Sequence, residues 1–143
     1  MGHSLSPVMH EASFRSLGIE ARYVCFDVAP DNLAGKLAEC CAEGFNGLNV
    51  TVPHKAAALG LMDRLDGSAR LFGAVNTVRI DGRGMTGFNT DVDGFMEDLA
   101  VNHRMTPEGR TVMVLGCGGA GRALAIGCAS RGASRLLLAE LEP

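Results

Sequence analysis

The sequence predicts an α/β fold organised as two domains, residues 1–100 and residues 101–143. Up to residue 100, apolar residues at helical spacing alternate with short runs rich in β-forming residues. Several of these runs end in polar side chains, as strands do where a parallel sheet lines a ligand crevice. From residue 111 the pattern becomes strand, glycine-rich turn, helix and strand, and this change places the domain boundary near residue 100.

The first two elements are a helix and a strand. Ser6 can cap a helix that has Pro7 at its first position, and the apolar residues that follow suit a helix ended by Gly18. Residues 22–28 alternate with a period of two and are rich in β-forming residues, so they predict a strand.

Spacing and turn residues define the rest of the first domain. The predicted elements are a helix over 33–41, a strand over 47–52 stopped by Pro53, a short helix after that proline, a second short helix over 66–72, a hairpin of strands over 75–80 and 85–88, and a helix capped by Thr90 or Asp91. We expect the last helix to bury one apolar face, made of Val92, Phe95, Met96 and Leu99.

Composition excludes several classes of protein. Hydrophobic residues make up 47% of the chain, which is enough for a core and too much for a disordered segment. The net charge of −3, without a run of Lys or Arg, gives no sign of a nucleic-acid partner. The sequence has neither a signal-peptide pattern nor an apolar stretch of membrane-spanning length. We therefore expect a cytoplasmic protein without a nucleic-acid or membrane partner. Our further expectation, which does not follow from composition, is a monomer or homodimer with a small-molecule substrate.

Cysteine and histidine usage predicts neither disulfides nor a metal site. The odd cysteine count and the lack of a C-x-x-C pair are typical of a reducing compartment. We expect buried free thiols at all five positions, Cys25, Cys40, Cys41, Cys117 and Cys128. His10 and His54 have no metal-ligand spacing, and we expect them to be packing or surface residues.

The glycine-rich turn predicts a dinucleotide site. Residues 116–121, Gly-Cys-Gly-Gly-Ala-Gly, follow a predicted strand and open a predicted helix, which is the context this motif requires. Glycine permits a tight turn, a close approach of backbone amides to a pyrophosphate, and close packing of helix on strand, with the helix N-terminus facing the anion. The predicted cofactor-binding residues of the turn are Gly116, Gly118, Gly119, Ala120 and Gly121.

Glu140 bears on which dinucleotide is bound. A carboxylate at the end of the second strand accepts hydrogen bonds from both ribose hydroxyls and repels a 2′-phosphate. The sequence therefore favours NAD over NADP, and the alternative is an ordinary solvated glutamate. No basic residue is placed to hold the phosphate of NADP, since Arg122 lies inside the motif helix and Arg135 at the far end of the strand.

Lys55 and Asp91 are candidates for proton transfer. Oxidising an alcohol by hydride transfer requires a group that removes the hydroxyl proton, and either side chain could do so. Each has a plain structural alternative, Lys55 as a solvated lysine at a helix start and Asp91 as a helix cap.

Five segments together carry a specific resemblance to one family. They are residues 3–7 (His-Ser-Leu-Ser-Pro), 49–55 (Asn-Val-Thr-Val-Pro-His-Lys), 73–77 (Gly-Ala-Val-Asn-Thr), 89–91 (Asn-Thr-Asp) and the glycine turn. In this order, over nearly the whole chain, they resemble the shikimate dehydrogenase family, including its quinate/shikimate branch. The resemblance implies reversible hydride transfer between 3-dehydroshikimate and shikimate, or dehydroquinate and quinate, with NAD or NADP, in a cleft between a substrate domain and a Rossmann domain.

The resemblance also implies a role for each matched side chain. Lys55 and Asp91 match the family's catalytic pair. Ser4 and Ser6 match the hydroxyl donors to the substrate carboxylate, Thr51 matches a further substrate contact, and Asn76 matches the residue that hydrogen-bonds the ring hydroxyls. The alternatives are an N-cap role for Ser6, a strand preference for Thr51 and a turn or bulge role for Asn76.

The chain departs from the family pattern in several ways. Glu11 stands where an asparagine often follows the histidine of the first helix. The family's first strand and most of its C-terminal Rossmann domain are not in the sequence, so we expect a fragment whose own activity is in question. The family's default cofactor is NADP, whereas Glu140 favours NAD and the quinate-using branch, and Ser6 is typical of shikimate-type members. A non-catalytic shikimate- or quinate-sensing domain of a regulator is the alternative from another class, and the presence of both Lys55 and Asp91 favours an enzyme.

Overall fold

The computed structural model describes residues 4–140, so His3 of the first motif lies outside the described residues. The chain divides into two compact units, Met1–Asn32 and Leu33–Pro143, which are described separately. The domain boundary near residue 100 stays a prediction. Among the described residues, no helix is long and apolar enough to cross a membrane.

The first unit contains α1 (Ser6–Ser16) and a short 3-10 helix, η1 (Pro30–Asn32). The predicted helix is confirmed, and Gly18 follows it with a positive φ of 66°, a conformation that glycine adopts without strain. The capping prediction is wrong, because Ser6 is the first residue of the helix and Leu5 occupies the N-cap position without a side-chain cap. Instead, the hydroxyl of Ser4 accepts a hydrogen bond from the Ser6 amide at 3.3 Å.

The strand predicted over residues 22–28 is not formed. Residues 19–29 have neither helix nor strand assignment, although Tyr23 stacks on His10 with 4.5 Å between ring centroids. Alternating side chains show that a segment can be extended, but strand assignment depends on a regular backbone ladder between segments, which local pattern does not encode.

The second unit is built on a four-stranded sheet in the order β1-β3-β4-β2. Its strands are β1 (Gly47–Asn49), β2 (Arg64–Leu65), β3 (Thr77–Asp81) and β4 (Gly84–Phe88). The predicted hairpin is confirmed, since β3 pairs antiparallel with β4 through a tight turn at which Gly84 has a φ of 97°. The expectation of a parallel sheet is wrong for this region. Only β2 and β4 run parallel in this sheet. The tight turn between β3 and β4 forces these two strands to run in opposite directions, and β1 also pairs antiparallel with β3.

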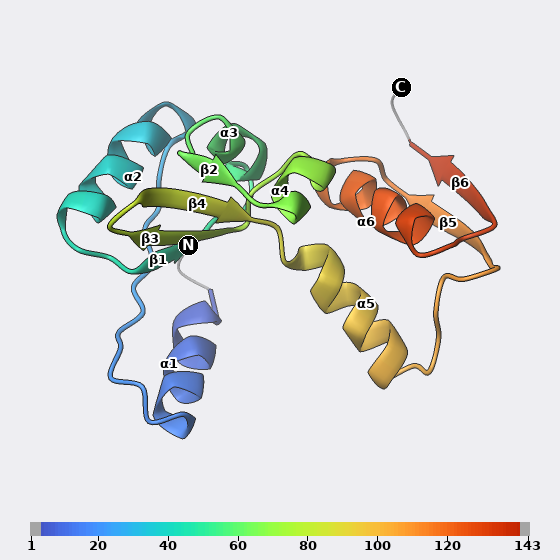
Figure 1. The fold of residues 1–143 in the computed structure, drawn as a ribbon, viewed down its shortest axis with the longest axis horizontal. Coiled ribbons are helices and arrows are strands. Elements are labelled where there is room, and N and C mark those ends of the chain that lie inside the picture. Colours follow the sequence, from blue (N-terminus) through green and yellow to red (C-terminus); the bar gives the residue numbers. More distant parts are fainter. Residues whose placement is uncertain (1–3, 141–143) are drawn as a thin grey trace. The chain divides into compact units, whose positions relative to one another are not determined.

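Three helices accompany this sheet: α2 (Leu33–Ala42), α3 (Lys55–Leu59) and α4 (Gly67–Phe72) (Figure 1). The helices predicted over 33–41, after Pro53 and over 66–72 are confirmed. Asp66 caps α4 by accepting a hydrogen bond from the Ala69 amide, and Gly73 ends the helix in the left-handed conformation. The buried residues of this core are Leu33, Leu37, Val50, Ala58, Ala69, Val75 and Val78.

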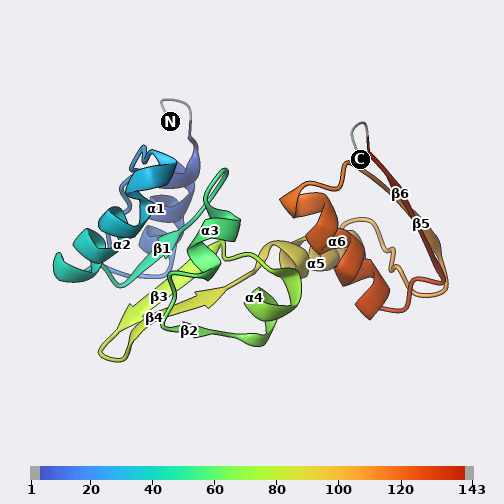
Figure 2. The same ribbon diagram turned by 90° about the horizontal axis from the view of Figure 1, so that it is seen from above.

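The chain continues through α5 (Asp91–Val101) into a βαβ unit made of β5 (Thr111–Leu115), α6 (Gly119–Ser130) and β6 (Arg135–Ala139). As predicted, β5 and β6 pair in parallel, and α6 packs on one face of them (Figure 2). A second core joins this unit to α4 and α5 through Phe72, Val92, Met96, Ala123 and Cys128. The expected apolar face of α5 is only partly buried: Val92 and Met96 are inside, whereas Phe95 is 42% exposed.

The cysteines are all free, but the expectation that all five are buried is wrong. Cys40 and Cys128 are buried, Cys41 and Cys117 are intermediate, and Cys25 is exposed. Cys25 belongs to the segment that does not form the expected strand. The alternating pattern of residues 22–28 therefore did not predict that the Cys25 side chain is exposed. Desolvation by burial raises the pKa of the Cys40 and Cys128 thiols.

Candidate active site

Lys55 and Asp91 form an ion pair, although they are separated by 36 residues in the chain. Lys55 is the first residue of α3 and Asp91 is the first residue of α5, so each side chain projects from a helix start that follows a strand or turn. The Lys55 Nζ atom lies 2.7 Å from Asp91 Oδ2. The two side chains are 29% and 37% exposed, which leaves the pair accessible to a ligand.

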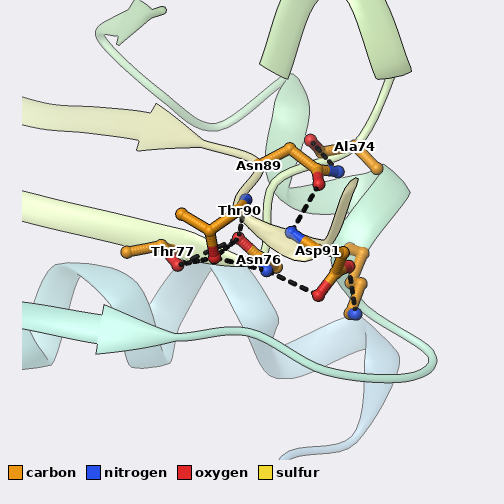
Figure 3. Close-up of polar contacts among 7 residues, drawn as sticks. Ala74, Asn76, Thr77, Asn89, Thr90 and Asp91 are labelled. Atoms are coloured by element: carbon orange, nitrogen blue, oxygen red, sulfur yellow. Dashed lines mark hydrogen bonds and ion pairs between the residues drawn. The ribbon is translucent and has the colours of Figure 1, made fainter. Parts of the chain in front are cut away.

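Asn76 fixes the other oxygen of the Asp91 carboxylate (Figure 3). Its Nδ2 group donates one hydrogen bond to Asp91 Oδ1 at 2.7 Å and another to Thr90 Oγ1 at 3.0 Å. An amide nitrogen carries two hydrogens, so both are used by these contacts. The Asp91 carboxylate is therefore held between an ammonium group on one side and an amide on the other.

The side-chain oxygen of Asn76, Oδ1, also has hydrogen-bond partners. It accepts hydrogen bonds from the Thr90 amide at 3.0 Å and from the Thr77 hydroxyl at 2.9 Å. Asn76 is only 8% exposed, and its side-chain amide hydrogen-bonds Thr90 and Asp91 at the start of α5. Its implied contact with the ring hydroxyls of a substrate stays a prediction.

Backbone hydrogen bonds bring the three polar segments together. The Val50 amide donates to the backbone carbonyl of Asn76 at 2.8 Å, and the Val75 amide donates to the backbone carbonyl of Lys55 at 2.8 Å. The Asn76 amide donates to the Phe88 carbonyl at 3.0 Å, just before the third segment. The sequence segments that end at Lys55, Thr77 and Asp91 therefore meet where β1 and β4 end and β3 begins.

Asn89, Thr90 and Thr77 also belong to this network, and the sequence reasoning did not include them in the site. Asn89 is 2% exposed, and its Oδ1 atom accepts a hydrogen bond from the Asp91 amide at 3.1 Å. An asparagine whose side chain bonds the amide two residues ahead is a known local turn. The asparagine two residues before Asp91 was therefore the feature of the sequence that could have indicated this contact.

The remaining predicted substrate contacts are placed separately. Thr51 is exposed and lies in a turn after β1 that is closed by a hydrogen bond from the His54 amide to the Thr51 carbonyl at 2.8 Å. Ser4 is exposed and Ser6 is partly buried, and both belong to the first unit. The roles of these three hydroxyls at the site stay predictions.

The glycine turn has the local geometry that the motif requires. Gly116 has a φ of 90°, which glycine alone adopts readily, and its amide donates to the Ala139 carbonyl at 2.8 Å. Gly118 is the N-cap of α6 and has no side chain to cover the first amides of the helix. Those amides are free of a side-chain cap and suit an anion at this helix terminus.

Glu140 is held at this turn, and not directed away from it. Its Oε2 atom accepts a hydrogen bond of 2.5 Å from the Cys117 amide, the second residue of the motif. The carboxylate therefore lies at the edge of the expected dinucleotide site. Residues 4–140 contain no group of three or more His, Cys, Asp and Glu side chains that could hold a metal ion.

Comparison with known proteins identifies the family of this site. A family model described as the shikimate dehydrogenase substrate binding domain matches residues 1–78. The chain belongs to the shikimate dehydrogenase family. This match includes Lys55 and Asn76, and Asp91 follows it in the chain.

Relatives agree with this assignment over the whole chain. The shikimate dehydrogenase (NADP(+)) of Citrifermentans bemidjiense is 46% identical over 143 residues, which are 100% of this chain and 49% of that protein. The structure of shikimate 5-dehydrogenase from Listeria monocytogenes, in complex with shikimate and NAD, is 33% identical and has a TM-score of 0.91 over 100% of this chain and 49% of that one. Relatives in the shikimate dehydrogenase family thus bind NADP or NAD.

The family also includes related reductases. The ligand-free 5-ketofructose reductase of a Gluconobacter strain is 38% identical, with a TM-score of 0.85 over 95% of this chain and 48% of that one. The present chain spans about half the length of each of these three proteins.

Proposed function

We propose that the full-length protein is an NAD(P)-dependent shikimate dehydrogenase, which transfers a hydride reversibly between 3-dehydroshikimate and shikimate. The observation that carries this proposal is the Lys55–Asp91 ion pair, held at 2.7 Å by side chains from two different helix starts. We further propose that residues 1–100 form the substrate-binding domain and residues 101–143 begin the dinucleotide-binding domain of a cytoplasmic monomer or homodimer.

Lys55 is the proton donor in this proposal. In the reducing direction, a hydride adds to the carbonyl carbon of the substrate while the Lys55 ammonium gives a proton to the carbonyl oxygen. An ammonium group has three donors, so one can bond Asp91 while another faces the substrate. Because Asp91 Oδ2 accepts a hydrogen bond from the Lys55 ammonium and Asn76 holds Oδ1, Asp91 serves to orient Lys55.

Four further side chains would bind the substrate. Ser4 and Ser6 would donate to the substrate carboxylate, and Thr51 would add a further hydroxyl contact. Asn76 would reach the ring hydroxyls by exchanging one of its internal hydrogen bonds for a bond to substrate. The turn residues 116–121 would hold the pyrophosphate of the dinucleotide, which supplies or accepts the hydride.

We propose NAD as the preferred dinucleotide, because the Glu140 carboxylate lies at the glycine turn and would repel a 2′-phosphate. By resemblance, the NAD-using branch also accepts quinate, so quinate is the second acid to test. Replacing Glu140 by Ala should bring the kcat/KM ratio for NAD over NADP markedly closer to one. The same ratio in Glu140→Ala and in the wild type would remove Glu140 from cofactor selection.

The decisive experiment is a comparison of kcat/KM on the full-length gene product, with shikimate and quinate, each with NAD and NADP. Reduction of 5-ketofructose is included because a relative is named for that activity. Lys55→Ala should lower kcat by about 10²- to 10⁴-fold, the usual contribution of a positioned acid or base. Tight binding of shikimate with no turnover in any combination would favour a sensing domain and contradict the proposal.

A further inference from the structure

A hydrogen-bonded chain links the backbones of Asp91 and Lys55 through one buried side chain, Asn89. The Asp91 amide donates to Asn89 Oδ1 at 3.1 Å, and Asn89 Nδ2 donates to the Ala74 carbonyl at 3.2 Å. That carbonyl and the Val75 amide belong to the same peptide group. The Val75 amide in turn donates to the Lys55 carbonyl at 2.8 Å.

All three hydrogen bonds point the same way along this chain, from Asp91 towards Lys55. Amide groups aligned in this manner polarise one another, so each bond strengthens the next. Asn89 is the one side chain in the chain of bonds, and every other participant is backbone. Figure 3 shows it between Ala74 and Asp91.

Burial and a third contact leave Asn89 with a single arrangement. The residue is 2% exposed, and its own amide donates to the Ser68 hydroxyl at 2.9 Å. The Ser68 hydroxyl donates to Asp66 Oδ1 at 2.6 Å, which anchors this end of the network to the cap of α4. Rotating the Asn89 side chain would leave a buried donor and a buried acceptor without partners, which is costly.

We propose that Asn89 is a positioning residue for the reaction: it sets the distance between the Lys55 ammonium and the Asp91 carboxylate by tying together the backbones that carry them. This inference rests on the proposed function of the Lys55–Asp91 pair. Asn89 does not contact the substrate in this proposal and acts only through the start of α5 and the peptide group before Val75.

The test compares Asn89→Ala with Leu37→Ala in the full-length gene product. Leu37 is 4% exposed, lies on α2 in the core of the sheet, and takes no part in the hydrogen-bonded chain, so its truncation provides a destabilised control. We would measure kcat and KM for shikimate well below the thermal midpoint of both variants. In parallel, amide hydrogen exchange at Val75 and Asp91 would report whether the chain of bonds is broken.

We expect Asn89→Ala to lower kcat by about 10- to 100-fold, because a small misplacement of reacting groups has effects of that order. The KM for shikimate should stay within about threefold, since the substrate-binding groups are retained. Relative to other core amides, exchange at Val75 and Asp91 should accelerate selectively in Asn89→Ala, whereas Leu37→Ala should accelerate the amides of its core together, Val75 among them. Leu37→Ala should also keep kcat within about twofold of the wild type.

Equal kcat values in the two variants, in an otherwise active enzyme, would overturn the positioning role and leave the proposed function intact. Unchanged exchange at Val75 and Asp91 would also overturn it, because the chain of bonds would not depend on Asn89. If Lys55→Ala were as active as the wild type, or the wild type had no turnover, the proposed function would fall and this inference with it.

Discussion

Asn76 holds Asp91 by donating a hydrogen bond, and an ionised carboxylate of the same shape has no hydrogen to donate. Asn76→Asp replaces an N–H donor, 2.7 Å from Asp91 Oδ1, with a second carboxylate oxygen. Losing a hydrogen bond to a charged group costs about 1.5–3 kcal/mol. Two charges about 4 Å apart repel by about 4 kcal/mol at the effective dielectric of a protein surface. Solvent reaches Asp91, which is 37% exposed, and the Lys55 ammonium attracts both carboxylates, so we expect a net loss of about 3 kcal/mol near pH 7.

The pH dependence of this loss has a definite sign. A carboxyl group that faces another carboxylate has a raised pKa in the folded state. The folded variant then binds more protons than the unfolded chain above about pH 3.9, so its loss of stability grows as the pH rises and shrinks on acidification.

The assay is urea unfolding of the full-length Asn76→Asp variant at pH 7 and pH 5, with Asn102→Asp as a matched control. Asn102 Nδ2 also donates to a carboxylate oxygen, Asp98 Oδ1, at 2.7 Å, but this pair is exposed near the end of α5. We expect the control to lose less than about 1 kcal/mol at either pH. Equal losses at the two positions, or a loss at position 76 that does not depend on pH, would refute the reasoning.

Two further predictions concern groups with shifted pKa values. Partial burial would raise the pKa of Asp66, but hydrogen bonds from the Ser68 hydroxyl and the Ala69 amide outweigh it and hold that pKa below 3.8. The wild type should therefore be about 1 kcal/mol more stable than Asp66→Ala at pH 7, and should lose this advantage as the pH falls below 3.8. Thermal unfolding of both proteins between pH 3 and pH 7 measures the difference. A difference in stability that does not change with pH would contradict the capping role. Because burial raises the pKa of Cys40 and Cys128, iodoacetamide at pH 8 should alkylate the exposed Cys25 first, as followed by peptide mass spectrometry. Earlier labelling of either buried thiol would show that this environment opens in solution.

Elements with strong local signals could be predicted from the sequence. The glycine turn, the hairpin and α4 each carry residues whose backbone or capping preference is nearly sufficient to define them, such as Asp66 before α4 and Gly73 after it. The start of α1 was predicted one residue too late, because Leu5, and not Ser6, is the N-cap and makes no side-chain cap. Neighbouring start positions of a helix differ by small free energies, which pattern alone does not rank.

Features that depend on distant neighbours could not be predicted in the same way. The direction of β1 and the lack of a strand over residues 22–28 depend on which segments pair, and side-chain alternation is the same for either outcome. The candidate pair was found because Lys55 and Asp91 have chemistry that reactions use. Asn89 was missed because its importance comes from Ala74, which lies 15 residues away in the sequence and 3.2 Å away in space.

Val92 stands next to Asp91 and is fully buried in the core that joins α5 to α6. A Cβ atom on Gly127 would lie only 2.3 Å from Val92 Cγ1, so the two helices are in direct contact at this point. One peptide bond therefore separates the carboxylate that meets Lys55 from the residue pressed against the helix that opens at the glycine turn. A displacement of α6 would therefore bear directly on Val92 and, through the adjoining peptide bond, on the backbone that carries the Asp91 carboxylate.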